Sequence, residues 1–402
     1  MSKSQQHTSS LVATAGINED TAFGAIISPL YLSANYSLET YGKKRDYDYS
    51  RTANPTRDQL ANLLVKLEGG ADALVLATGM AAIDLVLQPL KNGARVVAPH
   101  DCYGGTHRLL QARHKQGHII VEWVDQNSEE ALTRAFSRPA DLVFIETPSN
   151  PLMRIVDIAS IASLAKAAGA KVCVDNTFLT PVLQTPIVFG ADYVVHSTTK
   201  YLNGHSDIVG GAIVTAHAED GVLLKWWANC TGVTGSPFDA YMTLRGARTL
   251  FVRLERQQAS AAKIANYLNS HPAVSAVYYP GLTRHPGHTI AKRQQKGFGA
   301  MLSLELADGS EAVRQFIDAL KIFTLAQSLG GIESLIAHPA SMTHAGMPPE
   351  ARAVAGIKDN LLRLSIGLEH EEDLISDLDS ALAACTHAYP IKKQAGTASL
   401  PY

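Results

Sequence analysis

The chain has 402 residues, of which 46% are hydrophobic and 18% are charged, and its 35 basic and 37 acidic side chains nearly cancel. This composition is typical of a soluble globular protein, and the length favours a large domain with a smaller one. Balanced charge gives no field that attracts a polyanion, so we expect small-molecule substrates and neither nucleic acid nor a membrane as partner. The four cysteines include no CxxC pair, which argues against a structural zinc site or disulfide framework and favours a cytoplasmic location.

The first 60 residues contain few periodic segments but several aromatic side chains, and we interpret them as an arm that needs another surface to pack on. Beyond the arm, short runs that are apolar throughout alternate with helical patterns, which is typical of parallel strands buried on both faces. We expect strands at residues 73–77, 95–99, 118–124, 141–146, 171–175, 192–197 and 212–216. Segments 104–117 and 158–169 each end in glycine and are predicted as crossover helices.

After a long helical pattern at residues 249–270, strands are followed by helices without repeated βα units. This change indicates a separate α+β domain. The sequence therefore predicts an arm at residues 1–60, an open α/β domain at 61–258 and a smaller α+β domain at 259–402.

A lysine follows one of the predicted buried strands. Lys200 comes shortly after the run DYVVHS, with Ser197 and Thr199 just before it. In a protected pocket the pKa of a lysine falls, the amine can form an imine with an aldehyde, and neighbouring hydroxyls can bind a phosphate. The alternative is an ordinary solvated surface lysine.

Two further strand ends carry groups that suit a cofactor. Asp175 ends the run KVCVD, where a carboxylate is costly unless paired, and a protonated pyridine nitrogen is a suitable partner. An aspartate here is also a common helix N-cap. Gly79 and Met80 follow a strand and begin a helix, so their free amides predict an anion site, although a glycine turn is weak evidence and Met80 also suits a core position.

An aromatic and a basic residue complete the set. Tyr103 follows the run RVVAP, and its ring offers a stacking face for a flat cofactor, although a purely structural tyrosine is the common case. Arg363 lies inside the apolar run LLRLS, where a bound carboxylate or an ion pair within the protein would satisfy the guanidinium. No GxGxxG follows a strand, and neither GxxxxGK[ST] nor HExxH occurs, so dinucleotide, Walker-type and zincin sites lack their defining groups and no metal is expected.

Nine segments in order, between about residues 10 and 385, carry a resemblance to a known family: DYSRTANPTRD, ATGMAAI, HDCYGGTHRLL, ETPSNPL, VDNTFLTP, HSTTKYLNGHSD, GFGAMLS, SLGGIESL and HPASMTHAGM. The chain resembles the Cys/Met-metabolism family of pyridoxal-phosphate (PLP) enzymes, which implies PLP as cofactor. It also implies the fold type I (aspartate aminotransferase-like) fold, with a large parallel-sheet domain and a smaller C-terminal domain. Within the family, the stretches WWAN, GVTG, FDAYMTLRGARTL and ARAVAGI resemble the bacterial cystathionine γ-synthase branch.

The resemblance assigns roles to the catalytic residues. Lys200 would form the imine, Asp175 would pair with the pyridine nitrogen, Tyr103 would stack on the ring and Asn150 would bind the ring hydroxyl. The implied phosphate ligands are Gly79, Met80, Ser197 and Thr199, with Tyr49 and Arg51 reaching the site of a neighbouring subunit. Family members are typically tetramers of two catalytic dimers, so the resemblance also implies a homotetramer.

The resemblance implies that Ser328 and Arg363 hold the substrate α-carboxylate. The chain departs from the family pattern where Thr52 replaces a second arginine and Gln327 replaces a glutamate. Both positions belong to the distal end of the substrate pocket, together with Arg108, Asn229 and Asp48.

The implied reaction is γ-replacement on an O-acyl-L-homoserine, with O-succinyl as the expected donor and L-cysteine as nucleophile, giving L-cystathionine in transsulfuration and methionine biosynthesis. A γ-lyase or β-lyase of the same family, or γ-replacement with another donor or nucleophile, stays open. A non-catalytic interaction protein is a third interpretation, but such a member is expected to have lost Lys200 or Asp175, and both are present.

Overall fold

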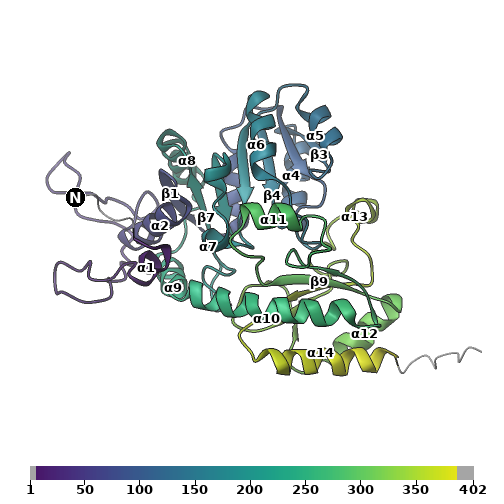
Figure 1. Ribbon diagram of the computed structural model, residues 1–402. Coiled ribbons are helices and arrows are strands. Elements are labelled where there is room, and N and C mark those ends of the chain that lie inside the picture. Colours follow the sequence, from purple (N-terminus) through teal and green to yellow (C-terminus); the bar gives the residue numbers. More distant parts are fainter. Residues whose placement is uncertain (1–5, 387–402) are drawn as a thin grey trace, which may run out of the picture.

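The computed structural model describes residues 6–386, and Figure 1 shows two sheet-containing parts with an N-terminal arm reaching away from them. All seven predicted apolar runs form strands of one sheet, in the order β1-β7-β6-β5-β4-β2-β3. These strands are β1 (Asp72–Leu76), β2 (Ala94–Pro99), β3 (Ile119–Val124), β4 (Leu142–Glu146), β5 (Lys171–Asp175), β6 (Tyr193–His196) and β7 (Gly211–Thr215). Their mostly buried side chains explain why the runs are apolar throughout.

One strand corrects the expectation of a parallel sheet. β7 pairs antiparallel with both β1 and β6. The pairs β2–β3, β2–β4, β4–β5 and β5–β6 are all parallel. A parallel neighbour needs a crossover that returns the chain to the opposite edge of the sheet, usually a helix. Residues 197–210, which connect β6 to β7, contain turns and no helix, so the chain reverses at the carboxyl edge.

Helices cover both faces of this sheet and bury two separate layers of side chains. Asn54 begins one of them by accepting hydrogen bonds from the amides of Thr56 and Arg57, and Gly69 ends it in the left-handed conformation. One face is covered by α2 (Pro55–Glu68), α5 (Glu129–Phe136), α6 (Ile158–Ala167), α7 (Thr180–Leu183), η1 (Pro186–Phe189) and α9 (Pro237–Ala247). The other is covered by α3 (Gly79–Leu87), α4 (Gly104–Lys115) and α8 (Ala218–Thr231).

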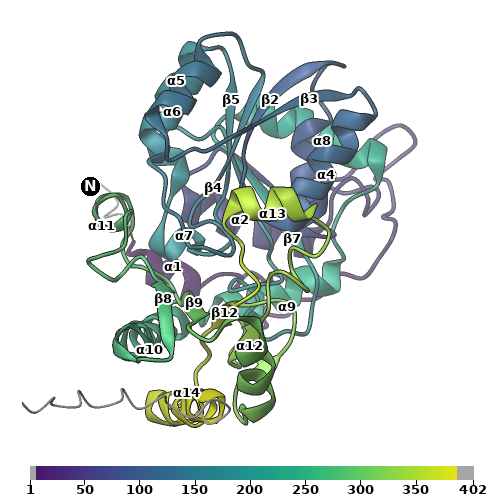
Figure 2. The ribbon, with the colours of Figure 1, turned by 90° about the vertical axis from the view of Figure 1, so that its right-hand side faces the viewer.

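The second sheet has the order β10-β11-β12-β9-β8 and is antiparallel except for the pair β10 and β11. Its strands are β8 (Val274–Tyr278), β9 (Met301–Leu306), β10 (Thr324–Leu325), β11 (Leu335–Ala337) and β12 (Leu361–Ser365). The helices of this part are α10 (Leu250–Ser270), α11 (His288–Gln294), α12 (Gly309–Ala319), α13 (Pro349–Ala355) and α14 (Glu371–Thr386). Helix α10 and α14 run side by side along its outer face (Figure 1), and α13 lies where the two parts meet (Figure 2).

The predicted boundary at residue 259 falls in the middle of α10. Residues of this helix join a hydrophobic cluster that extends from the large sheet to the small one. Residues 1–5 and 387–402, which belong to the first and last predicted regions, lie outside the described residues, and the division into three regions stays a prediction.

The arm contains the short helix α1 (Thr8–Ala13) and, up to α2, isolated bridges in place of strands. Its large apolar side chains are exposed, including Phe23 at 93% and Leu32 at 68%. No helix among residues 6–386 is long and apolar enough to cross a membrane.

Candidate active site

A cavity of about 530 Å³ lies where the strands of the large sheet end and the small sheet begins. The carboxyl ends of β1, β2, β4, β5 and β6 reach it, which is where open α/β sheets bind ligands. The predicted residues that line it are Gly79, Met80, Tyr103, Arg108, Asn150, Asp175, Ser197, Thr199, Lys200, Gln327, Ser328 and Arg363.

Lys200 is the central basic group of this cavity. Its Nζ atom donates a 2.6 Å hydrogen bond to Oγ of Ser328. Burial, with a smaller contribution from the charge of Arg363, lowers the pKa of Lys200 to about 8. The side chain is therefore no solvated surface lysine, and an appreciable fraction of its amine is neutral near neutral pH.

Arg363 lies on β12, and its side chain is buried. Its guanidinium donates from Nη1 to Oδ1 of Asn150 at 3.0 Å and from Nη2 to the carbonyl of Ser328 at 2.8 Å, while Nε has no hydrogen-bond partner in the described chain. Burial lowers its pKa to about 10. No carboxylate of residues 6–386 forms an ion pair with Arg363, so its charge is available for a carboxylate in the cavity.

Ser328 connects these two cationic groups, and its backbone has φ of 86°, a region that L-residues rarely adopt. In this conformation its hydroxyl meets Lys200 while its carbonyl meets Arg363. The left-handed backbone is thus found where one residue must present both polar groups to the cavity.

Asp175 ends β5, and burial raises the pKa of its carboxyl while hydrogen bonds from Thr177 lower it. Its Oδ1 atom accepts a 2.9 Å hydrogen bond from the amide of Thr177. Helix α7 begins only after Leu179, so Asp175 is not an N-cap. A half-buried carboxylate that lines a cavity suits a cationic partner such as a protonated ring nitrogen.

The beginning of α3 forms an anion site. Thr78 caps the helix by accepting from the amide of Ala81, which leaves the amides of Gly79 and Met80 at the first turn. A Cβ atom on Gly79 would lie 2.8 Å from Cβ of Ser197, so only glycine keeps the backbone and this serine so close. Amides and hydroxyls, with Thr199 beside them, are donors that suit a phosphate.

The sequence analysis missed Glu146, a buried glutamate that lines the cavity at the end of β4. Its carboxylate accepts from the amides of Tyr103 at 2.9 Å and Asn150 at 3.0 Å. The signal was an acidic residue that ends an apolar run, as Asp175 does. Further lining residues that were missed include Thr177, Phe178, Val209, Met342 and Thr343.

Five predicted residues do not line the cavity of their own chain. Arg51 donates from Nε to Oδ1 of Asn229 at 2.9 Å, and its guanidinium carbon lies 5.5 Å from the ring centroid of Tyr49. Asp48 pairs with Lys44. Thr52 lines a separate small hollow beside α2. The role of Tyr49 and Arg51 toward a neighbouring subunit and the role of Asp48, Thr52 and Asn229 at the distal end of the substrate pocket stay predictions.

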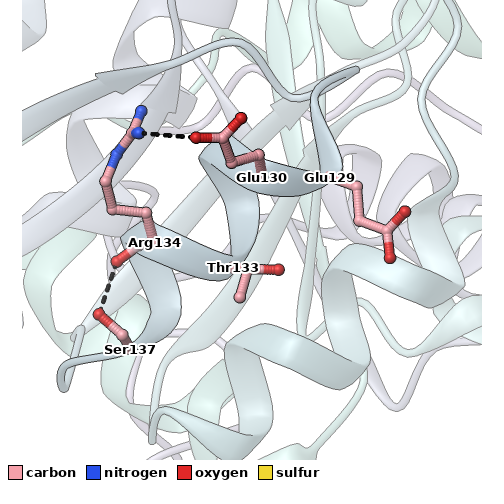
Figure 3. A pocket seen from close by; sticks show the side chains of 5 residues that line it. All are labelled: Glu129, Glu130, Thr133, Arg134 and Ser137. Carbon is pink, nitrogen blue, oxygen red and sulfur yellow. Dashed lines mark hydrogen bonds and ion pairs between the residues drawn. The ribbon is translucent and has the colours of Figure 1, made fainter.

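Another hollow, on the outer side of α5, has no comparable chemistry (Figure 3). It is lined by Glu129, Glu130, Thr133, Arg134 and Ser137. Its one ion pair joins Arg134 to Glu130 at 3.7 Å, and both side chains are largely exposed. A solvated pair of this kind contributes little, and we regard the hollow as ordinary surface.

The chain is similar to known proteins over nearly its whole length. Cystathionine gamma-synthase of Escherichia coli K12 is 51% identical over 375 residues, 93% of this chain and 97% of the relative. Cystathionine beta-lyase of Lactococcus lactis subsp. cremoris is 46% identical over 371 residues, 92% of this chain and 97% of the relative. A crystal structure of cystathionine gamma synthase from Xanthomonas oryzae pv. oryzae in complex with cystathionine has a TM-score of 0.95 and 55% identity, covering 96% of this chain and 100% of that one.

The fold and the site thus define a PLP-dependent enzyme. Residues 9–383 match the Cys/Met metabolism PLP-dependent enzyme family, and the chain belongs to this family.

The cavity fits the cofactor of the family. Lys200 has the lowered pKa that reaction with an aldehyde requires, and Asp175 is a half-buried carboxylate without a cationic side chain bonded to it in the described residues. The absence of a Cβ atom at Gly79 lets Ser197 lie against the start of α3, so that its hydroxyl and the free amides of the helix are gathered in one place, as a phosphate requires. Tyr103, 38% exposed, presents its ring at the same cavity.

Proposed function

We propose that the protein catalyses γ-replacement on an O-acyl-L-homoserine, with O-succinyl-L-homoserine as donor and L-cysteine as nucleophile, forming L-cystathionine in transsulfuration and methionine biosynthesis. The arrangement of Lys200, Ser328 and Arg363 carries the proposal, because it places a weakly basic amine next to a carboxylate-binding guanidinium. The similarity to proteins named cystathionine gamma-synthase supports the choice of reaction.

Arg363 binds the α-carboxylate of the amino-acid donor. Its unpartnered Nε and its Nη donors suit the two carboxylate oxygens, and the contacts to Asn150 and Ser328 hold the guanidinium in place. Fixing the carboxylate at Arg363 brings the donor's Cα within reach of Lys200, whose Nζ is held at the same serine.

Lys200 then acts as general base. PLP, when bound, supplies an electrophilic aldehyde and a ring that accepts electrons. The neutral amine of Lys200 takes the proton from Cα, and a pKa of about 8 suits both taking and returning a proton near neutral pH. Asp175 keeps a proton on the ring nitrogen, where burial makes the charge–charge attraction strong.

The distal end of the donor lies toward Arg108 and Gln327, which both line the cavity. A succinyl ester ends in a carboxylate, and Arg108 is the cationic group that we assign to it. Thr52 and Gln327 are both neutral, so the preference for succinyl over acetyl donors is expected to be modest.

A lyase reaction is the second candidate, because cystathionine beta-lyase of L. lactis matches nearly the same length of the chain. Lyases use the same basic and acidic groups and end in a 2-oxo acid and ammonia. The two reactions differ in whether a thiol or water reaches the activated donor first.

We also propose that the enzyme is a cytoplasmic homotetramer built from catalytic dimers. The position of Tyr49 and Arg51 on an exposed arm, away from the cavity of their own chain, supports a site completed by a neighbouring subunit. The free state of Cys102, Cys173, Cys230 and Cys385 supports a reducing compartment.

Product analysis tests the proposed reaction. The PLP-loaded enzyme is incubated with the O-succinyl, O-acetyl and O-phospho esters of L-homoserine, each with and without L-cysteine. We expect cystathionine from the succinyl ester when cysteine is present. Release of 2-oxo acid and ammonia at the same rate with and without cysteine would instead assign the protein to the lyases.

A further inference from the structure

Glu146 and Asp175 lie side by side at the ends of neighbouring strands of the large sheet. The two residues are register partners on the parallel strands β4 and β5, so their side chains extend from the same face of the sheet into the same cavity. Glu146 is 7% exposed, and like-charge repulsion from Asp175 adds to the cost of burying it. A second buried carboxylate at this position needs a reason.

The two oxygens of Glu146 have different partners. Oε2 accepts from the amide of Tyr103 at 2.9 Å, and Oε1 accepts from the amide of Asn150 at 3.0 Å. Tyr103 lies at the start of α4, after β2, and Asn150 lies in the loop after β4. One carboxylate therefore ties together two segments that both line the cavity.

Asn150 is held at three points. Besides its amide, its carbonyl accepts from Nε2 of His344 at 3.0 Å, and its Oδ1 accepts from Arg363. The side-chain NH₂ group is left to face the cavity. A shift of the backbone at Asn150 would therefore also move a group that touches Arg363.

We propose that Glu146 is a positioning residue. By binding the backbone amides of Tyr103 and Asn150 with the two oxygens of one carboxyl group, it determines the position of the PLP ring in the cavity. Its action passes through these two residues, since its hydrogen bonds end on their amides. Burial and repulsion from Asp175 raise the pKa of Glu146 well above its usual value, and the hydrogen bonds from the amides of Tyr103 and Asn150 oppose this shift only in part.

Glu146→Gln tests this role, because glutamine has the same shape but only one accepting oxygen. One of the two amides then faces an NH₂ group, and we expect the dissociation constant of PLP to rise about ten- to a hundredfold. The constant is measured from the visible absorbance of holoenzyme dialysed against fixed PLP concentrations. We also expect altered visible circular dichroism of the bound cofactor, which reports the seat of the ring. Glu305 is also a buried glutamate, but it lies on β9. Glu305→Gln is the matched control and should change neither the dissociation constant of PLP nor the circular dichroism.

Double-mutant cycles separate positioning from general stabilisation. Each variant raises the dissociation constant of PLP by some factor. If Glu146 acts through Tyr103, the factor for the double variant Glu146→Gln/Tyr103→Ala is at least about threefold smaller than the product of the factors for the two single variants. We expect the same difference when Glu146→Gln is combined with Asn150→Ala. When Glu305→Gln is combined with Tyr103→Ala or Asn150→Ala, the factor for the double variant should equal the product of the single factors. Thermal melting checks folding, and Glu146→Asp, which keeps the charge but shortens the reach, enters the same cycles if the glutamine variant does not fold. Unchanged affinity and dichroism, or strictly multiplicative losses in both cycles, would overturn the proposal.

Discussion

The Nζ atom of Lys200 lies 2.6 Å from Oγ of Ser328, although the two residues are 128 positions apart and belong to segments beside different sheets. The same serine gives its carbonyl to Arg363. The amine of Lys200 and the guanidinium of Arg363 are therefore held by a single residue, and their relative position depends on how the two sheets are joined.

The lowered pKa of Lys200 predicts a pH-dependent stability in the cofactor-free protein. Because the folded-state pKa is about 8 and the unfolded value is 10.5, the folded state binds fewer protons between these values, and stability rises with pH across that window. Relative to Lys200→Met, the natural protein should gain about 3 kcal/mol of unfolding free energy between pH 8 and 10.5. Denaturant unfolding of both proteins at several pH values measures this difference.

Lys171→Met is the control for that experiment. The pKa of Lys171 is raised by hydrogen bonds and charge interactions with Asp220 and Asp192, despite the opposing effect of burial. Its stabilising contribution is present below pH 10.5 and lost at higher pH, so the difference from the natural protein should stay flat between pH 8 and 10. If the difference in unfolding free energy between the natural protein and Lys200→Met also stays constant with pH, the protonated amine of Lys200 is not destabilised by its surroundings.

Asp175→Ala should weaken PLP binding and also lower kcat at saturating PLP by about a hundredfold or more, because the ring nitrogen loses its buried counter-charge. Thr177→Val keeps the carboxylate but removes the side-chain hydrogen bond to it and the hydroxyl that accepts from the amide of Ser197, so we expect a smaller loss of kcat than from removing the charge itself. Steady-state kinetics over a range of PLP concentrations distinguish the two effects. Full recovery of kcat in Asp175→Ala at high PLP would limit this residue to cofactor binding.

A shared active site predicts complementation between chains. Arg51→Ala and Lys200→Ala are each expected to be defective, but a hybrid dimer contains one site with an intact Arg51 and an intact Lys200. After subunit exchange at equal amounts, activity should reach about a quarter of the natural value, since half of the dimers are hybrids with one good site of two. Activity that never exceeds the sum of the parents would mean that the arm serves its own chain.

The neutral residues Thr52 and Gln327 predict weak selectivity for the distal end of the donor. A charge-assisted hydrogen bond contributes about 1.5–3 kcal/mol, so an arginine paired with a glutamate there could change the discrimination ten- to a hundredfold. We expect Thr52→Arg/Gln327→Glu to raise the kcat/KM ratio of succinyl over acetyl ester. The two single variants are the controls, and an unchanged ratio in the double variant would contradict this assignment.

Local pattern predicted the strands because most of them are largely buried, and apolar runs such as 171–175 and 192–197 are typical of such strands. The edge strand β3 was predicted from its apolar run although it is only partly buried. The direction of β7 was predicted wrongly, because it depends on the turns of residues 197–210 and not on the strand itself. Most of the predicted site residues do line the cavity, since strand ends converge at one edge of the sheet.

Glu146 was missed for a different reason. Its partners are backbone amides, one of them 43 residues away, and amides carry no signature in the sequence. The contact of Arg51 with Asn229 on α8 and the position of Thr52 likewise depend on how the arm lies, which no periodic pattern determines.

The partition of O-succinyl-L-homoserine between replacement and elimination, measured as L-cysteine is raised to saturation, tests the proposed reaction most directly. Cystathionine and the 2-oxo acid are quantified together from one reaction with PLP-loaded enzyme. We predict that cystathionine becomes the dominant product and that release of 2-oxo acid falls in proportion. Continued dominance of 2-oxo acid and ammonia at saturating cysteine would contradict a γ-replacement enzyme.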